Sequence, residues 1–526
     1  MKPPAQWDAI CVGAGITSLA FCAHLIARRP ATRILVIDKH SVAGGYASVF
    51  ERPKAPGVFD CSLHKLSGMG EGGNLRRMFE SLGLDRELTL VTPSTYFEAC
   101  LPEGSFVLGN SHPAAERALV ERFPAERQAI VDFFREVNTY GRHGYYQFQM
   151  MEGTYEADFA ELRHAHRHLK HVSVSDALAA RFQDGLLREI IGATAVYVGG
   201  FPEDLSYLYF LHVVYATLCK SNAYVQGASQ ALSNSLARRV TDAGGAVMLD
   251  TAVQRIVEDA DGNAVGVDTA QGRFLSNRVY VNASPHYAMR NLFAASAKMG
   301  AVDAKLRALK PSRSTTTVYL TCDQRPSELG LASCETMIFA GTHQSSLAER
   351  ARAHAAPEDQ ALCEHAFWHS SPMEVTNYNL LDPAGGNVVC LNVLDSIGHW
   401  PERRAATYKA KKQRAIDAML GRLFAAKPQL EGHVAYCELS SPRTYQRFTN
   451  NTDGAGYGAM VGLDMSGHAF HRQFPVKGVH FLSAWVAGPS YEAAFGYAEM
   501  KAKQWTASAA PAARAPSRHE EAKETA

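Results

Sequence analysis

The first forty residues contain two short apolar runs separated by a helical pattern. Residues 9–12 (AICV) and 34–37 (ILVI) are wholly apolar, as expected for buried strands of a parallel sheet. Between them, residues 16–26 place apolar side chains at helical spacing. A strand, a helix and a second strand, with both strands buried, predict an α/β fold built on a parallel sheet.

The turn between the first strand and the helix favours phosphate binding. Gly13 permits a tight turn, Ala14 follows, and Gly15 lets the backbone approach a pyrophosphate. The helix N-terminus offers free N–H groups to that phosphate. Asp38 ends the second strand, where its carboxylate can accept a hydrogen bond from a ribose hydroxyl. This order predicts a dinucleotide site, although Ser18 replaces the third glycine of G-x-G-x-x-G.

A second glycine site shifts the choice of dinucleotide toward FAD. Asp38 is followed by Lys39, four further residues, and then Gly44, Gly45 and Tyr46. Paired glycines suit a close approach of the backbone to a bulky, charged ligand. The arrangement resembles the start of the two-dinucleotide-binding-domain flavoproteins. There the acid holds the adenosine ribose of FAD, and the glycine pair runs along the ribityl-pyrophosphate.

Further segments resemble the family of phytoene desaturases, carotenoid isomerases and retinol saturases. Residues 57–64 resemble the FD-x-G-x-H segment of that family, and residues 224–236 resemble its aromatic and glycine signature. Residues 244–256 resemble the strand that returns to the adenine. Residues 440–458 and 476–502 resemble its two C-terminal signatures. The resemblance implies bound FAD. It also implies that Val253 offers its backbone to the adenine, and that Ala484 and Trp485 contact the flavin.

The chain departs from this family around the flavin ring. Ser62 stands where glycine is usual, and Ser483 with Ala484 stands where Gly-Asp or Gly-Ala is usual. The glycine-rich P-G-G-G stretch is replaced by residues 487–492, which include the bulky Tyr491 and Glu492. These changes predict an altered floor of the flavin pocket.

The segments imply an α/β, Rossmann-like two-dinucleotide-binding-domain (FAD) flavoprotein with an inserted α+β substrate domain. We expect a discontinuous FAD-binding domain in residues 1–95, 225–295 and 431–505, and a substrate domain in residues 96–224 and 296–430. Residues 506–526, rich in Ala, Pro and charge, are expected to be a disordered tail. Residues 205–219 are apolar nearly all round, which fits a buried helix, the wall of a tunnel, or contact with a membrane surface.

Three titratable residues are candidates for catalysis. The resemblance places His64, Tyr491 and Glu492 near the isoalloxazine. Histidine suits proton transfer near neutrality, and burial can tune a glutamate upward into the same range. A structural role for each residue is an open alternative.

Composition and charge limit the other functions. With 53 basic and 52 acidic residues, the net charge of +1 gives no reason to expect nucleic acid as a partner. The 10 cysteines form no C-x-x-C pair. His164 and His168 could share a helical face as metal ligands, but no further ligand lies nearby in sequence, so no metal is expected. The basic run around them is a candidate for contact with anionic lipid.

No segment reaches the roughly 20 uninterrupted apolar residues of a spanning helix. Two glycines interrupt the apolar N-terminal stretch, which disfavours a signal peptide. We therefore expect a cytoplasmic protein, with peripheral membrane contact left open.

The leading hypothesis is an FAD-dependent oxidoreductase that desaturates, saturates or isomerises carbon–carbon double bonds. Its substrate would be hydrophobic: a polyisoprenoid, a lipid-like chain or a specialised metabolite. Two alternatives remain open, a flavin amine oxidase and a non-redox prenyl or lipid carrier on the same fold. The electron acceptor and the oligomeric state are not indicated by the sequence.

Overall fold

The computed structural model describes residues 6–508 except residues 63, 295–298, 342, 465 and 473. Residues 506–508, expected to begin a disordered tail, form the end of helix α20 (Tyr491–Ser508). The rest of that expected tail, residues 509–526, lies outside the described residues.

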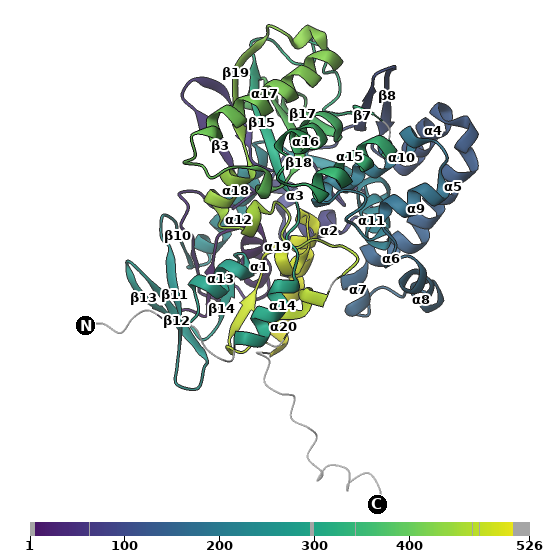
Figure 1. Cartoon of the computed structure of the whole chain (residues 1–526). Helices are drawn as coiled ribbons and strands as arrows, with labels where there is room; N and C mark the ends of the chain where they lie inside the picture. The colour runs from purple at the N-terminus through teal and green to yellow at the C-terminus, as the bar shows by residue number, and fades with distance from the viewer. Residues whose placement is uncertain are drawn as a thin grey trace, which may run out of the picture.

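A five-stranded parallel sheet forms the lower part of the molecule in Figure 1. Its strand order is β10 (Ala246–Met248), β2 (Ile34–Ile37), β1 (Ala9–Val12), β14 (Val279–Val281) and β20 (Val479–Phe481). Helix α1 (Ile16–Arg28) packs against α20 and against α12 (Ala228–Asp242). The α/β fold with a Rossmann-like sheet is therefore confirmed, and its strands come from widely separated parts of the chain.

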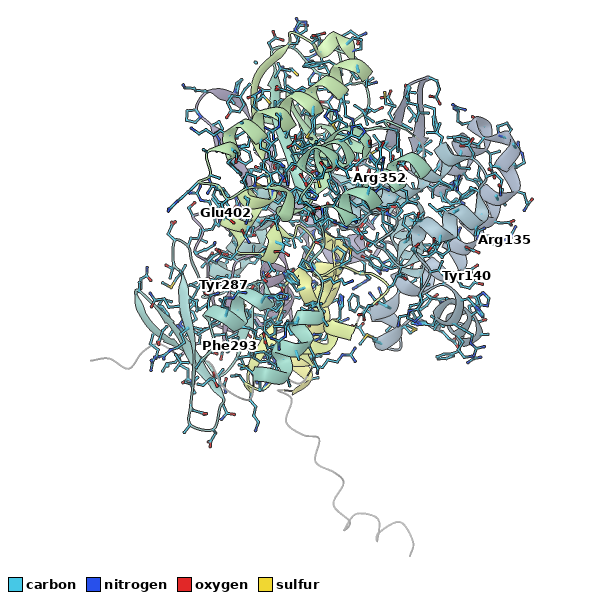
Figure 2. All side chains as sticks on the ribbon, in the orientation of Figure 1. Arg135, Tyr140, Tyr287, Phe293, Arg352 and Glu402 are labelled. Atoms are coloured by element: carbon cyan, nitrogen blue, oxygen red, sulfur yellow. The ribbon has the colours of Figure 1, made fainter. Side chains whose placement is uncertain are left out.

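An antiparallel sheet of β11 (Val253–Glu258), β12 (Ala264–Thr269) and β13 (Gly272–Leu275) lies at the lower left of Figure 1. Beside the parallel sheet, helix α13 (Pro285–Asn291) carries Tyr287, and Phe293 follows it (Figure 2). Phe293 packs on Phe474 with ring centroids 5.1 Å apart.

A second large sheet fills the upper part of Figure 1. It has seven strands, in the order β19 (Val434–Ser440), β15 (Ser314–Cys322), β18 (Val388–Asp395), β17 (Met373–Asn377), β16 (Glu335–Ile338), β7 (Thr95–Leu101) and β8 (Gly104–Gly109). Strand β19 lies within residues 431–505, expected from sequence to belong to the FAD-binding domain, yet it pairs with β15.

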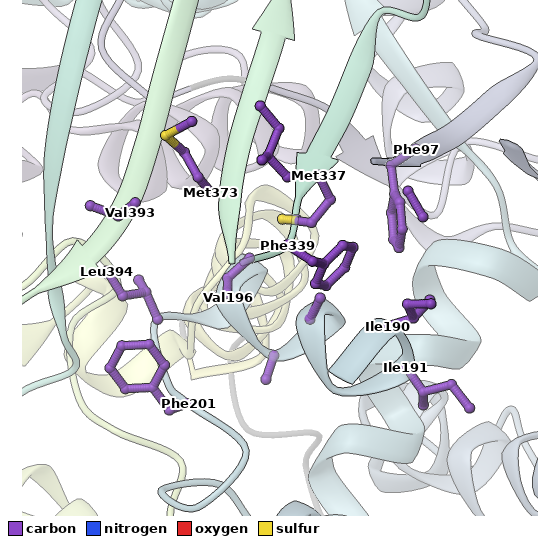
Figure 3. Close-up of a cluster of buried hydrophobic side chains, with 14 of the residues drawn as sticks. Phe97, Ile190, Ile191, Val196, Phe201, Met337, Phe339, Met373, Val393 and Leu394 are labelled. Carbon is purple, nitrogen blue, oxygen red and sulfur yellow. The ribbon is translucent and has the colours of Figure 1, made fainter. Parts of the chain in front are cut away.

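The two faces of this second sheet differ in polarity. Val318, Leu391 and Val375 lie opposite one another across β15, β18 and β17, and share a hydrophobic core with Met419 and Leu423 of α17 (Thr407–Ala426). Elsewhere in this core, Leu394 at the end of β18 lies over Phe201 in the view of Figure 3.

Helices form the right side of Figure 1, where Figure 2 labels Arg135 and Tyr140. They include α4 (His112–Arg122), α5 (Arg127–Glu136), α7 (Gln147–Met151), α8 (Phe159–His168), α9 (Val174–Arg181), α10 (Gly185–Gly192) and α11 (Tyr207–Val214). Helix α11 continues as a π-helical turn, Tyr215–Cys219, so the apolar run expected to be a buried helix is one. None of the described helices combines the length and the apolar character needed to cross a bilayer.

The remaining helices are α2 (Asn74–Leu82), α3 (Leu84–Glu87), α6 (Arg142–Tyr145), α14 (Gly300–Ala308), α15 (His343–Ala355), α16 (Gln360–Glu364), α18 (Pro442–Thr449) and α19 (Ala484–Ala487). Short strands complete the fold. They are β3 (Val49–Arg52) with β4 (Ala55–Asp60), and β5 (Leu66–Ser67) and β6 (Leu90–Val91) on either side of β9 (Asn222–Val225).

Candidate active site

The turn after β1 contains two glycines that pack closely against Asn282. Gly13 has a φ of +101°, and a Cβ there would lie 2.5 Å from the carbonyl oxygen of Asn282. A Cβ on Gly15 would lie 2.6 Å from the Asn282 side-chain nitrogen Nδ2. Helix α1 then begins at Ile16 with no side-chain cap from the described residues, so its first N–H groups point out of the turn.

Asp38 fixes this turn from the end of β2. Its Oδ2 accepts a hydrogen bond from the Ala14 N–H at 2.6 Å, and its Oδ1 accepts one from the His40 N–H at 2.9 Å. Each carboxylate oxygen retains a second lone pair for a ligand hydroxyl. The Thr251 N–H donates to the Asp38 carbonyl at 2.8 Å, which brings the start of β11, and thus Val253, to this end of the sheet.

The second glycine pair lies beside the first turn. The Gly44 N–H donates to the Ala14 carbonyl at 2.8 Å, and both Gly44 and Gly45 have positive φ. Tyr46 follows and donates its hydroxyl to the Ala455 carbonyl at 3.0 Å. Lys39 points elsewhere, with its Nζ 3.4 Å from the Arg447 carbonyl.

Unsatisfied polar atoms surround the glycine turn. Asn282 Nδ2, Ser18 Oγ and Ser483 Oγ are buried and have no hydrogen-bond partner among the described residues. They follow or flank the carboxyl ends of the parallel strands, where ligands bind in sheets of this kind. Burying such groups without partners costs free energy, and a ligand pyrophosphate would satisfy the Asn282 amide. The residues present therefore fit a bound dinucleotide.

A cavity of about 410 Å³ extends from this region into the helical side of the molecule. Ile16 and Thr17 of α1, the whole of α19 and the first turn of α20 line one side. Tyr209, His212, Val213 and Ala216 line the other, so the apolar run 205–219 is both a buried helix and a cavity wall. Of the predicted cofactor-binding residues, Tyr46, Ala484 and Trp485 line the cavity. Gly13, Asp38 and Val253 are not among the lining residues and belong to the region of the glycine turn.

Two departures from the family pattern contact each other at the cavity floor. The hydroxyls of Ser62 and Tyr491 lie 3.1 Å apart, and Ser62 also donates to the Tyr46 carbonyl at 2.9 Å. Just before Tyr491, Ser490 has a φ of +98°, a conformation that favours glycine. The chain thus keeps a glycine-like backbone where the family has glycines, at the cost of local strain.

Glu492 is buried in the first turn of α20 and lines the cavity. Its Oε2 accepts a hydrogen bond from the Ser67 hydroxyl at 3.2 Å, while its Oε1 has no partner in the described part of the chain. Burial raises the pKa of Glu492 to about 7, although Tyr145 and Ser67 oppose this effect. Gly68 approaches so closely that a Cβ there would meet Oε1 at 2.5 Å.

His64 lines the same cavity. Its Nδ1 is 2.8 Å from the Thr376 hydroxyl, and its Nε2 is 3.8 Å from Glu374 Oε2. Burial lowers the pKa of His64, which favours the neutral ring. The cavity therefore brings together all three catalytic candidates: His64, Tyr491 and Glu492.

Sequence reasoning missed a buried ion pair next to His64. Lys65 Nζ is 2.9 Å from Glu335 Oε2 and donates to the Tyr197 hydroxyl at 2.9 Å. Burial raises the pKa of Glu335 to about 7, Lys65 lowers it and Glu374 raises it further. The sequence did contain a signal for this ion pair: the two short β-rich runs that form β16 and β17 each contain a glutamate. Because buried strands rarely carry unpaired charge, a glutamate there indicates a charged partner.

The helix with the histidine-rich run offers little to a metal. The rings of His164 and His168 lie 4.7 Å apart on α8. In the described ranges of the chain, no three His, Cys, Asp or Glu side chains gather as a metal site would require.

A parallel sheet with a glycine turn at its carboxyl edge, and a cavity beside that turn, are features of dinucleotide-binding oxidoreductases. Residues 11–82 match the NAD(P)-binding Rossmann-like domain family. The chain is 24% identical to the rat (Rattus norvegicus) all-trans-retinol 13,14-reductase over 493 residues, which cover 87% of this chain and 78% of that protein.

Two further relatives have related names. Phytoene desaturase (neurosporene-forming) of Rhodobacter capsulatus is 24% identical over 280 residues, or 52% of each chain. The chloroplastic prolycopene isomerase of Daucus carota is 21% identical over 483 residues, 86% of this chain and 72% of that protein. This chain is a distant homologue of that group, which confirms the resemblance seen in its motifs.

Solved structures agree on the fold. Putrescine oxidase bound to putrescine superposes with a TM-score of 0.62 at 16% identity, covering 96% of this chain and 100% of that one. An oxidoreductase from Methanosarcina mazei gives a TM-score of 0.60 at 13% identity, covering 94% and 99%.

Proposed function

We propose that this oxidoreductase binds FAD and desaturates, saturates or isomerises carbon–carbon double bonds in a hydrophobic, polyisoprenoid substrate. The observation that carries the proposal is the single cavity that joins the glycine-turn region to an apolar wall. On one side it meets α1 and residues 484–492, and on the other it meets α11. The names of the retinol, phytoene and prolycopene relatives support the substrate class.

The residues that would hold FAD belong to the glycine turn, the second glycine pair and the cavity described above. Gly13, Ala14, Gly15, Ser18 and Asn282 would surround the pyrophosphate, with Asp38 and Val253 at the adenosine. Gly44, Gly45 and Tyr46 would follow the ribityl chain, with Ala484 and Trp485 beside the ring. Bound flavin would supply the group that takes or gives a hydride.

We assign proton handling in the cavity to Glu492. Its Oε1 is buried and unpartnered within the described residues, and its pKa of about 7 lets it hold or release a proton near neutrality. Tyr491 stays protonated at that pH because burial raises its pKa, and its hydroxyl orients on Ser62. His64, kept neutral by burial, also lines the cavity.

The first test is whether the purified protein retains added FAD after gel filtration, read from flavin absorbance. Gly15→Val should abolish retention because the new side chain would collide with Asn282. Gly421→Val is the matched control, since no described atom lies within 4 Å of a Cβ at that helical position. A wild-type protein that stays colourless would refute the cofactor assignment, and a Gly15→Val variant that retains FAD would refute the placement of the pyrophosphate at the glycine turn.

We also propose that the cavity mouth contacts an anionic membrane. Residues of α7 line the cavity, and Met151 at its end is 71% exposed. Phe159, 68% exposed, begins α8, which also displays exposed Arg163 and Arg167. Exposed apolar side chains next to basic ones are typical of contact with a lipid surface.

A further inference from the structure

One face of the seven-stranded sheet carries a buried row of polar side chains. Strand pairing places Glu335 opposite Thr376 across β16 and β17, and Asn392 opposite both Glu374 and Thr317 across β17, β18 and β15. All five are buried. On the opposite face, Val375, Leu391 and Val318 pack into an apolar core. Because burying polar groups is costly, this row calls for a reason beyond packing.

A small chamber of about 60 Å³ lies at the β15–β18 end of this row, where Thr317 and Asn392 form part of its wall. Its walls include Thr315, Thr317, Tyr319, Asn392, Tyr445 and Tyr457. The chamber adjoins the main cavity, because Tyr46, Ser62, His64, Gly456 and Tyr457 line both spaces. A molecule in the main cavity would therefore lie beside the chamber.

The chamber walls can both donate and accept hydrogen bonds. The Thr317 hydroxyl lies 3.1 Å from Asn392 Oδ1 and 2.8 Å from the Tyr445 hydroxyl, which in turn lies 3.3 Å from the Tyr319 hydroxyl. A hydroxyl rotor has one hydrogen and two lone pairs, so this group can turn to meet either a donor or an acceptor. Such walls suit an alcohol, whose hydroxyl is both a hydrogen-bond donor and an acceptor.

The charges around the chamber disfavour an ionised guest. No Lys or Arg belongs to its lining within the described ranges. The nearby Lys65 is paired with Glu335. Asp60 lines the chamber but accepts from the Ser229 N–H at 2.7 Å and the Ser229 hydroxyl at 2.9 Å. A carboxylate guest would meet Asp60 without a cation, and an ammonium guest would compete with Ser229 for Asp60.

We propose that this chamber binds the terminal hydroxyl of an otherwise apolar substrate whose body lies in the main cavity. The inference rests on the proposed function, because it assumes a hydrophobic guest. It makes Thr317, Asn392 and Tyr445 residues that determine specificity rather than residues that act on the double bonds.

The test compares four ligands of one skeleton by equilibrium binding to the FAD-treated protein. They are all-trans-retinol, the hydrocarbon in which its CH2OH is replaced by CH3, retinoic acid and retinylamine. Retinol should bind roughly tenfold more tightly than the hydrocarbon, about the effect of one net hydrogen bond to a buried group. The acid and the amine should bind more weakly than retinol.

Thr317→Val and Tyr445→Phe should remove the preference for retinol and leave hydrocarbon binding unchanged. The matched control is Thr321→Val, on the same strand and face but outside the chamber lining, which should retain the preference. Thermal melting of each variant would establish that it is folded.

Equal binding of retinol and hydrocarbon, tighter binding of either charged ligand, or an unchanged preference in Thr317→Val would overturn the inference. Because the readout is binding, these results leave double-bond chemistry untouched. Failure to bind any of the four ligands would instead contradict both the inference and the proposed substrate class.

Discussion

Single residues show where sequence reasoning ends. The family resemblance placed Glu492 near the flavin, because residues 476–502 follow a known signature. Its environment depends on partners that no local pattern indicates: Ser67 from β5, Gly68 after it, and Tyr145 from the helical side. Likewise, Ser62 and Tyr491 were each recognised as a departure, but only the fold shows that they contact each other.

The raised pKa of Glu492 makes a prediction about stability. An unfolded glutamate titrates near its model value of 4.5, and the folded one near 7. The neutral form is therefore favoured by folding, so its contribution is fully present below pH 4.5 and is lost as the pH rises through 7. Glu492→Gln should remove up to ~3 kcal/mol of this pH dependence, measured as denaturant unfolding at pH 5 and pH 8.

Glu258 is exposed, so Glu258→Gln is the control variant. It should leave the pH dependence of stability unchanged. Identical pH profiles for wild type and Glu492→Gln would contradict the assigned environment of Glu492.

At the scale of elements, the alternation of residues along a strand does not show what covers its two faces. The alternation of Thr315, Thr317 and Tyr319 with other residues predicts β15, but in an antiparallel sheet such alternation usually indicates one face in water. Here both faces are buried, because the polar face turns toward the chamber. Whether the polar face of β15 meets water or a chamber depends on the segments that cover it. These include Tyr445 of α18 and Tyr457, which lie far along the chain from β15.

The contact between α1 and α20 contains two groups that titrate in different, partly overlapping pH windows. Burial lowers the pKa of His24 from 6.5 to about 3. Burial raises the pKa of Glu499, but Arg77, His24 and Lys503 together outweigh burial, and the pKa falls from 4.5 to about 2. Both contributions are present at high pH. That of His24 is lost as the pH falls from 6.5 toward 3, and that of Glu499 as it falls from 4.5 toward 2.

His24 should lower the free energy of unfolding by about 2 kcal/mol between pH 7 and pH 5, and His24→Leu should abolish this loss. Glu499→Gln should leave the change in unfolding free energy over this interval as it is in the wild type. Chemical denaturation of both variants across this range is the measurement. A His24→Leu variant whose stability changes between pH 7 and pH 5 by the same amount as that of the wild type would show that His24 is not held neutral by burial.

For the whole molecule, the order of cofactor-like and unlike segments predicted the α/β class and a second, inserted part. The sequence did not indicate that β19, next to a C-terminal signature, completes the seven-stranded sheet. Pairing between residues far apart in sequence depends on the whole fold and leaves no local signal. The same holds for the cavity, whose walls come from α1, α7, α11 and α20.

The proposed membrane contact is tested by vesicle co-sedimentation. Vesicles that contain anionic lipid should retain the wild-type protein, and the double variant Met151→Gln with Phe159→Gln should bind at least several-fold more weakly, because it loses two apolar side chains from the interface. Val107→Gln, at an exposed apolar position on β8, is the control. Equal sedimentation of the double variant and the control would argue against contact at this surface.

The most direct test of the central claim is an anaerobic titration of the FAD-loaded protein with polyenes, followed by absorbance of flavin and polyene together and by mass analysis of the products. The account predicts that flavin oxidation or reduction accompanies the loss or gain of a double bond. Alternatively, the polyene is isomerised with its mass unchanged, and the reaction requires bound flavin. In either case Gly15→Val should be inactive. Polyenes that remain unchanged while simple amines reduce the bound flavin would contradict the account and identify an amine oxidase.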